Sequence, residues 1–309
     1  MPTRQQLFEA HVRELLRESR ALEPVARKRI LALLEEARQR VLARLAGLRP
    51  SQTYLDVTLR QMKREIDAAF KEFSGRAIGE ANRLQEQSAR MGTQSVDRTL
   101  AIAGKTAPMP IGLSPVTLRV AQGYTADLIT ALSREARAKV NGALQRAFLG
   151  GQSLTEIIEQ VAGGLGSKGP LNLFSKVGER ATTITINEIK RVLSISTQER
   201  MEQVAERTGA ALKKQWLWVD VGQEPRAWHQ RSALHNGANG QIREVDEDFL
   251  VGGESLAYPR DPKGSAENTI NCHCVSTPYF DKEDLAGLEP TARQRNILQD
   301  LGLEIRVSP

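Results

Sequence analysis

The sequence is poor in aromatic residues and cysteines, and it has no long apolar run. Aromatic side chains make up 5% of the 309 residues, whereas Ala, Leu, Arg, Glu and Gln are abundant. This composition is typical of long helices packed through aliphatic side chains and disfavours an aromatic-rich, compact enzyme core. A membrane-spanning helix needs roughly 18 consecutive apolar residues, and no run approaches that length. Residues 1–20 also lack the apolar core of a signal peptide, so we expect a cytosolic product.

The chain has only two cysteines, Cys272 and Cys274, and one residue separates them. Two cysteines this close do not readily form a disulfide with each other. We therefore expect a reducing compartment, with the pair either free or bound to metal. The stretch from Trp216 to Tyr279 holds both cysteines, all three tryptophans and three of the four histidines. The rare side chains of the chain are thus gathered in one region.

Positive charge is concentrated in the first half. Residues 1–150 carry 25 Lys and Arg against 15 Asp and Glu, while the remaining residues carry 18 against 22. A basic helical half indicates an acidic partner, such as double-stranded DNA or an acidic protein surface. The alternative is a solvated surface rich in Arg–Glu pairs. Six residues of the second predicted helix are the candidate DNA or partner contacts: Arg27, Lys28, Arg29, Arg38, Arg40 and Arg44.

Apolar residues at three- and four-residue spacing predict three helices in the first 104 residues. The first covers residues 4–22, and we expect Glu23-Pro24 to end it because the residue before proline avoids helical geometry. The second ends at Arg49-Pro50. The third begins near Ser51 and reaches residue 100, although its apolar face weakens after Gly75. Its far half is therefore predicted to be exposed or to pack on a partner.

A Pro/Gly-rich segment, residues 105–115, is the predicted linker between two domains. Helices are expected from Ser114-Pro115 to Phe148, over residues 154–161, and over residues 177–208 with Gly209 as the end. From Lys213 the pattern changes to strand formers, and short strands are predicted over residues 215–219, 241–245 and around residue 275. Between them, residues 225–234 form a short helix or turn, and residues 258–262 form an irregular loop.

These patterns predict a mainly α protein of the α+β class, in which a long helical N-terminal arm or bundle precedes a helical domain with a small antiparallel sheet. The sheet is expected to use the strands near Trp216 and Val275. The predicted domains are a basic helical arm or bundle at 1–104, the linker at 105–115, a second domain at 116–280 and a helical tail at 281–309.

Four side chains in the Trp216–Tyr279 stretch could hold a metal ion. Zinc takes thiolate sulfur and imidazole nitrogen in tetrahedral sites, and His229, His235, Cys272 and Cys274 would complete such a set. Residues two apart in a strand point to the same side, so both thiols could face one ion. The alternative is that two buried, reduced cysteines act as small apolar side chains and the histidines bond to loop carbonyls. The sequence thus predicts a structural zinc site, and it leaves a metal-free pair of buried cysteines as the alternative.

Catalysis is the competing interpretation of the same residues. A metal-dependent nuclease, or another enzyme acting on DNA, could use His229, His235 and Asp261. The chain lacks a glycine-rich phosphate loop, a nucleophile elbow and a His-Glu-x-x-His motif. The nearby carboxylates fall in turn and loop sequence, where solvated structural roles are commoner. A non-enzymatic role is therefore the simpler prediction.

An ordered set of short motifs resembles the phage Mu F-like head morphogenesis proteins, the minor head proteins of tailed phages. The match covers roughly residues 120–280 and includes Arg-x-x-His, Asn-Gly, Tyr-Pro-x-Asp-Pro and Asn-Cys-x-Cys. His273 stands where the family usually has arginine. The positions that carry the resemblance are Glu188, Trp216, Asp220, Arg226, His229, Gly237, Tyr258, Pro259, Asp261, Asn271, Cys272 and Cys274.

The resemblance implies a virion component of the phage head, recruited near the portal during assembly in the host cytoplasm. Its expected partner is the portal protein, and the major capsid or scaffolding protein and double-stranded DNA are further candidates. Such proteins are linked to head assembly, DNA packaging or DNA ejection. No membrane partner is expected. A third interpretation is a plain nucleic-acid-binding protein that uses its basic half.

Overall fold

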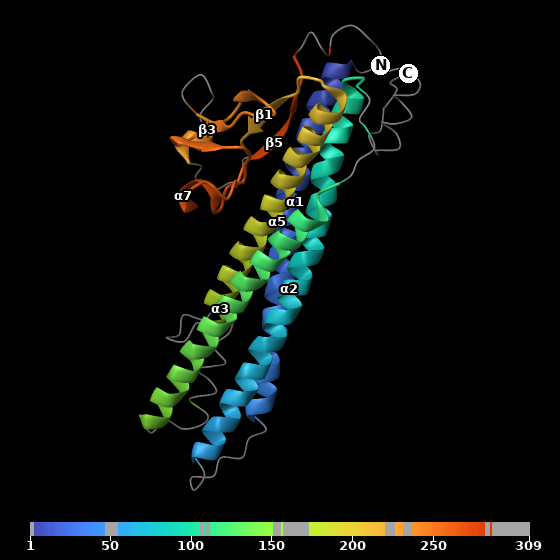
Figure 1. The fold of residues 1–309 in the computed structure, drawn as a ribbon. Coiled ribbons are helices and arrows are strands. Elements are labelled where there is room, and N and C mark those ends of the chain that lie inside the picture. The colour runs from blue at the N-terminus through green and yellow to red at the C-terminus, as the bar shows by residue number, and fades with distance from the viewer. Residues whose placement is uncertain are drawn as a thin grey trace. The chain divides into compact units, whose positions relative to one another are not determined.

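Four long helices make up most of the protein: α1 (Arg4–Ala46), α2 (Leu55–Ile102), α3 (Pro115–Leu149) and α5 (Leu173–Thr208) (Figure 1). This computed structural model describes residues 3–46, 55–105, 108, 112–150, 156, 173–219, 226–230, 237–281 and 285. The mainly α prediction is confirmed. Among the described helices, none combines the length and the apolar character that crossing a membrane requires.

A three-stranded antiparallel sheet follows the helices. Its central strand is β1 (Lys213–Leu217), with β2 (Ile242–Glu244) on one side and β5 (Val275–Tyr279) on the other. Trp216 pairs with Ser276, and Leu217 pairs with Val275. The predicted sheet, built from strands near Trp216 and Val275, is therefore confirmed. Burial alternates along β1, which places the Trp216 side chain on the inner face.

The part of the chain that the structure describes also contains a two-stranded hairpin and two four-residue helices. The hairpin pairs β3 (Phe249–Val251) with β4 (Glu254–Leu256), and the helices are α6 (Ala227–Gln230) and α7 (Ala266–Thr269). The hairpin was not predicted, because its strands are only three residues long. The signal was present: Gly252-Gly253 adopts positive φ at both positions, and two such residues favour a tight hairpin turn.

The chain forms two compact units, and each unit draws on separate parts of the sequence. Unit 1 comprises Met1–Glu23, Gln85–Val120 and Asn187–Pro309, and unit 2 comprises Pro24–Leu84 and Ala121–Ile186. Both units therefore contain residues from before and after the predicted linker at 105–115. A compact unit and a family module need not coincide, so the predicted domain division stays a prediction.

Each unit has its own aliphatic core. The core of unit 2 comes from α1, α2, α3 and α5, with Phe70 and Phe73 among its largest side chains. In unit 1, Val96 and Leu100 of α2 pack with Met201 and Val204 of α5. The far half of α2 is thus covered by the protein itself, so the prediction that it is exposed or packs on a partner is wrong. Its predicted weak positions, Ala81, Leu84 and Ser88, are all buried.

The predicted helix end at Glu23-Pro24 is wrong. Helix α1 continues through Pro24, which lies inside it and is exposed. Proline removes one hydrogen bond from a helix and costs about 3 kcal/mol. Leu22 and Ala26 on either side of it are both buried, and burial of the helix on both sides of the proline outweighs this local cost.

The predicted helix ends near the linker and at Gly209 are confirmed. The Ser114 hydroxyl accepts a hydrogen bond from the Val116 amide at 3.3 Å at the start of α3, and Gly209 adopts a positive φ of 62° after α5. The predicted helix at 154–161, apart from Glu156, and the tail at 282–309, apart from Leu285, lie outside the described residues.

Candidate metal centre

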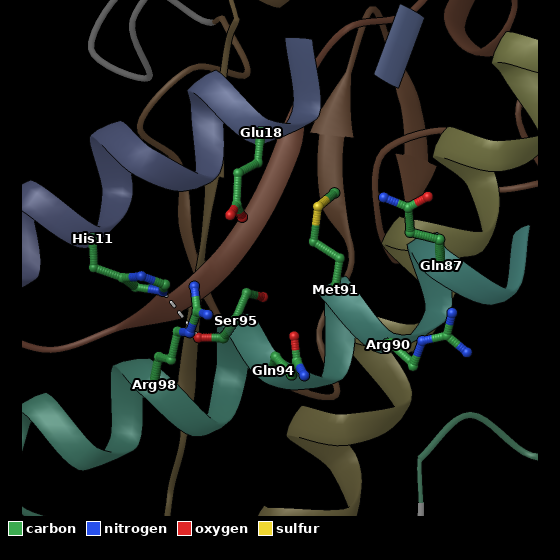
Figure 2. A pocket seen from close by; sticks show the side chains of 8 residues that line it. All are labelled: His11, Glu18, Gln87, Arg90, Met91, Gln94, Ser95 and Arg98. Carbon is green, nitrogen blue, oxygen red and sulfur yellow. Dashed lines mark hydrogen bonds between the residues drawn. The ribbon is translucent and has the colours of Figure 1, made fainter. Parts of the chain in front are cut away.

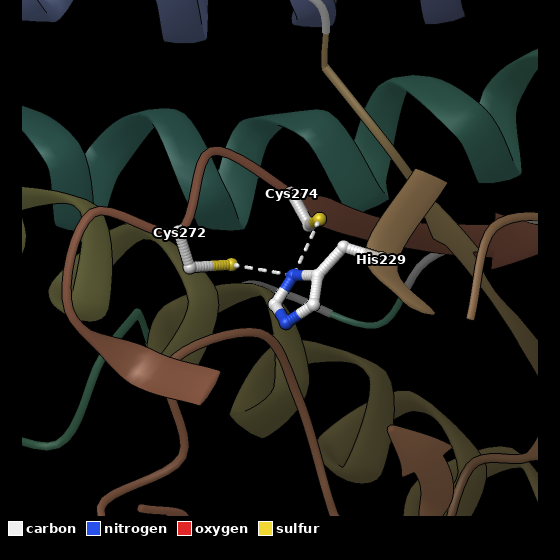
Figure 3. Close-up of side chains that lie close together, drawn as sticks. All are labelled: His229, Cys272 and Cys274. Carbon is white, nitrogen blue, oxygen red and sulfur yellow. Dashed lines mark hydrogen bonds between the residues drawn. The ribbon is translucent and has the colours of Figure 1, made fainter. Parts of the chain in front are cut away.

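Three side chains of unit 1 converge at one point (Figure 3). His229 is on α6, and Cys272 and Cys274 are on the segment that leads into β5. The Nδ1 atom of His229 lies 3.6 Å from Sγ of Cys272 and 3.5 Å from Sγ of Cys274. These three potential ligand atoms all lie within 4.8 Å of one another. The structure thus brings together three of the four predicted metal ligands.

The separations fit a tetrahedral zinc ion. Zn–S bonds of about 2.3 Å and a Zn–N bond of about 2.05 Å, at tetrahedral angles, place sulfur and nitrogen about 3.6 Å apart. The two distances from His229 match this value. A hydrogen bond from a thiol to the imidazole nitrogen gives similar distances, so the geometry suits both a metal ion and a metal-free thiol pair. Two thiolates and one imidazole are also a donor set that zinc prefers.

The cluster is closed off by apolar side chains. Cys272 and Cys274 are 2% and 1% exposed, and His229 is 3% exposed. Around them pack Trp216, Phe249 and other residues of one apolar cluster. The indole ring of Trp216 meets the imidazole ring of His229 edge to face, with centroids 6.0 Å apart. A catalytic zinc site keeps one position open to substrate, whereas this burial is typical of a structural site.

The two thiols have opposite pKa shifts. A hydrogen bond from Cys274, together with His229 and the charge of Arg260, lowers the pKa of Cys272 well below its usual value. Burial and the neighbouring Cys272 thiolate raise the pKa of Cys274. A metal ion held by both sulfurs would require both thiols to be deprotonated, which would couple its binding to pH.

Arg260 binds the backbone of the cysteine segment through hydrogen bonds. Its guanidinium is fully buried, with Nε donating to the Cys272 carbonyl at 2.8 Å and Nη2 donating to the Cys274 carbonyl at 3.0 Å. Nη1 donates to the Ser194 hydroxyl at 3.1 Å and to the Lys190 carbonyl at 3.3 Å, both on α5. The Arg260 side chain therefore connects α5 to the backbone carbonyls of Cys272 and Cys274, the two neighbours of His273. Arg260 lies within the Tyr-Pro-Arg-Asp-Pro motif, but its role was not predicted.

Other predicted motif residues form hydrogen bonds with the backbone around this cluster. The Asp261 carboxylate accepts hydrogen bonds from the Ala257 and Lys263 amides, at 2.9 and 3.0 Å. Arg226 donates to the Ile270 carbonyl at 2.6 Å. Because both oxygens of Asp261 are bound by amides and its side chain is buried, Asp261 is poorly suited to hold a catalytic metal.

Glu188 and Asn271 link the motif to α5. Glu188 accepts two hydrogen bonds of 2.7 Å from Arg191, and Arg191 also donates to the Arg260 carbonyl at 3.3 Å. Burial raises the pKa of Glu188. Asn271 adopts a positive φ of 54°, and its amide donates to the Asn187 side chain at 2.9 Å.

Of the remaining predicted residues, three lie in the described part of the chain and two lie outside it. Gly237 is buried, and its carbonyl accepts a hydrogen bond from the Gln241 side chain at 2.8 Å. Pro259 is buried and Tyr258 is half-buried in the predicted irregular loop. His235, the fourth predicted zinc ligand, and Asp220 lie outside the described residues.

Half of the predicted basic contacts are engaged in ion pairs within unit 2. Arg29 pairs with Glu80 at 2.6 Å, Arg38 pairs with Glu35 at 2.6 Å, and Arg40 pairs with Glu72. Arg27 and Lys28 are exposed, and the side chain of Arg44 lies outside the described part of the chain. Paired arginines retain less positive potential for phosphate groups, so these three arginines fit the solvated Arg–Glu interpretation, while DNA contact by the other three stays a prediction.

A separate cavity of about 200 Å³ lies between α1 and α2 in unit 1 (Figure 2). His11 and Glu18 line it from α1, and Arg90, Ser95 and Arg98 are among the residues of α2 that line it. Its charged lining is mixed, with two arginines and one glutamate. None of these residues is part of the His229 cluster or of the motif set.

A curated relative from Bacillus subtilis (strain 168), named uncharacterized protein YqbB, is 34% identical over 128 residues. The match covers 40% of this chain and 39% of the relative, so the chain spans about two fifths of the length of that relative. No protein-family profile matches the chain. No solved structure matches it either.

Proposed function

We propose that the chain is a non-enzymatic minor head protein of a tailed phage, similar to the Mu F-like head morphogenesis proteins. One observation carries this proposal. Motif residues that lie up to about 90 positions apart, from Glu188 to Cys274, form one connected and mostly buried network in unit 1. A set of short motifs that forms a single core supports a shared module more strongly than scattered matches would.

The same burial supports a structural role rather than catalysis. The three side chains of the cluster are each at most 3% exposed, and the Asp261 carboxylate is occupied by backbone amides. A nuclease must bring a phosphodiester to its metal ion and its base. The described residues of this network offer no exposed group of that kind, so assembly with a partner is the function that we favour.

The proposed partner is the portal protein of the same phage, with the virion head as the final location. To test this, the full chain would be co-expressed with the portal protein encoded by the same genome and purified through a tag on the portal. We expect the two to co-purify as a complex that survives gel filtration. A portal ring that elutes without this chain under assembly conditions would argue against the proposal.

We further propose that His229, Cys272 and Cys274 hold a structural zinc ion. When bound, the ion would cross-link α6 to the segment that precedes β5. Elemental analysis of the purified full chain is expected to give one zinc per chain, and Cys272→Ser should lose it. His11→Gln, which changes a buried histidine elsewhere in unit 1, should keep it. A wild-type value well below one metal per chain would end the proposal.

A further inference from the structure

Asn268 of α7 contacts His229 on the side opposite the two sulfurs. Its Oδ1 atom lies 3.2 Å from Nε2 of His229 and 2.7 Å from Nε1 of Trp228. Its Nδ2 atom donates to the Val251 carbonyl at 3.2 Å. Asn268 is 3% exposed, so these contacts are made away from solvent.

The contacts determine which atom of Asn268 faces the histidine. An indole nitrogen can only donate a hydrogen bond, so the atom opposite Trp228 must be an acceptor. The Val251 carbonyl can only accept, so the atom opposite it must be the amide nitrogen. Both neighbours therefore require the same orientation of the Asn268 side chain, with Oδ1 toward His229.

This orientation in turn determines the tautomer of His229. Because Oδ1 accepts, Nε2 of His229 must carry the proton and donate it. In a neutral imidazole the other nitrogen then has a free lone pair. That nitrogen is Nδ1, the atom that lies between the two cysteine sulfurs (Figure 3). In the neutral imidazole, the nitrogen that faces the sulfurs is therefore the one able to bind a metal ion.

We propose that Asn268 is a positioning residue for the metal centre: it fixes the Nε2–H tautomer of His229 and so presents Nδ1 to a thiophilic ion such as zinc. This inference rests on the zinc site proposed above. Partners that accept the second N–H of a metal-binding histidine orient its ring and raise its basicity, and losing one typically lowers metal affinity 10- to 100-fold.

Two substitutions separate this role from packing. Asn268→Leu keeps the branched shape of the side chain but removes the acceptor, and we expect zinc affinity to fall about 10- to 100-fold. Asn268→Asp keeps an acceptor for His229 and Trp228 and should retain affinity within about tenfold of the wild-type value. Asn239→Leu is the matched control, because Asn239 accepts from the Trp218 amide at 3.0 Å. It should leave affinity within about threefold.

The experiment measures zinc affinity in the full chain by competition with a chromophoric chelator, and the absorption spectrum of the cobalt-substituted protein. Nitrogen-15 NMR of His229 in the metal-free wild-type chain provides a second readout, which is independent of any variant's folding. We expect the Nε2–H tautomer. An Nδ1–H tautomer, or an Asn268→Leu affinity that falls by less than about tenfold, overturns the positioning role.

The two proposals fail in different ways. A wild-type chain that binds no zinc overturns the metal centre, and the role of Asn268 in metal binding falls with it. If the wild-type chain binds zinc but Asn268→Leu and Asn239→Leu lose equal zinc affinity, the metal centre is supported and the specific role of Asn268 is overturned. Rescue by Asn268→Asp supports it.

Discussion

Arg260 is the buried charge on which the geometry of the cysteine segment depends. It donates four hydrogen bonds, two of them to the Cys272 and Cys274 carbonyls, and its own backbone has a positive φ of 67°. A positive φ is uncommon for a residue with a side chain and persists where surrounding contacts enforce it. The guanidinium contacts with both cysteine carbonyls and with α5 provide that enforcement.

Replacing this side chain should destabilise the protein strongly. Arg260→Met keeps an unbranched apolar side chain but removes the donors, leaving two buried carbonyls unpaired, and we expect a loss on the order of 3 kcal/mol or more. Urea unfolding in the presence of a chelator would measure it without a contribution from metal binding. Lys263→Met, at an exposed position of the same loop, should change stability by less than about 0.5 kcal/mol. A loss below about 1 kcal/mol for Arg260→Met would contradict this account.

His11 is a second buried polar residue, at the cavity of Figure 2. Its Nε2 donates to the Ser95 carbonyl at 3.1 Å, while Nδ1 is buried without a partner among the described residues. Burial chiefly, with the charge of Arg98, lowers the pKa of His11 from 6.5 to about 4, and the Ser95 hydrogen bond opposes this. Glu18 lines the same cavity, and burial raises its pKa.

The lowered pKa predicts that His11 makes stability depend on pH. The unfolded chain binds this proton near pH 6.5 and the folded chain only near pH 4, so the unfolded state holds more protons in between. The contribution is fully present above pH 6.5 and is lost as the pH falls through about 4, on the order of 3 kcal/mol in total. Comparing urea unfolding of the wild type and His11→Gln across this range isolates it. A pH-independent difference would refute the prediction.

At the scale of elements, α2 and α5 approach each other closely at Gly92 in unit 1. A Cβ atom at this position would lie 2.3 Å from the Ser196 hydroxyl and 2.6 Å from the Leu193 carbonyl oxygen. The carbonyl belongs to the backbone of α5, so it cannot move without moving the helix. Glycine in the interior of a helix is ordinarily unfavourable, and here the close approach requires it.

Gly92→Ala should therefore destabilise the protein, although alanine is the better helix former. Overpacking costs about 1–3 kcal/mol and the gain in helix propensity is about 1 kcal/mol, so we expect a net loss of up to about 2 kcal/mol. Gly79→Ala is the matched control in the same helix, because nothing lies within 4 Å of its Cβ. That substitution should stabilise by about 0.5–1 kcal/mol. Thermal unfolding measures the stability of both variants. If Gly92→Ala also stabilised the protein, the contact between α2 and α5 would not be tight.

At the scale of the whole molecule, neither compact unit is a continuous stretch of sequence. The core of unit 1 joins Val96, Leu100 and Ala103, which precede residues 105–115, to Met201 and Val204, which follow them. A cut in the predicted linker therefore separates two parts of one core. Removal of either part would expose apolar surface that the other part now covers.

A fragment of residues 116–280 should consequently fail to fold by itself. We expect it to aggregate or to lack a cooperative unfolding transition in circular dichroism. A full chain nicked by a protease at a site engineered into residues 105–115 should instead elute as one species in native gel filtration, because the core holds the two parts together. A fragment that unfolds cooperatively at the same midpoint as the full chain would favour the sequential domain division.

Much of the fold could be predicted because it depends on local patterns. Helices α2, α3 and α5, the pairing of strands near Trp216 and Val275, and the stop at Gly209 all followed from apolar spacing, strand propensity and a helix-ending glycine. The predicted helix end at Pro24 was wrong, because burial on both sides of the proline outweighs the tendency of proline to interrupt a helix. The β3–β4 hairpin was missed because its strands are too short to show a period.

The sequence alone determined the helical class and singled out His229, His235, Cys272 and Cys274, because residue type and spacing are local properties of the chain. His235 lies outside the described residues. Only the tertiary structure decided that His229, Cys272 and Cys274 meet, since the histidine lies 43 and 45 positions from the cysteines. It also decided which nitrogen faces the sulfurs, through Asn268, and what holds the cysteine segment, through Arg260. Contacts of this kind depend on how distant elements pack, and no local pattern in the sequence specifies them.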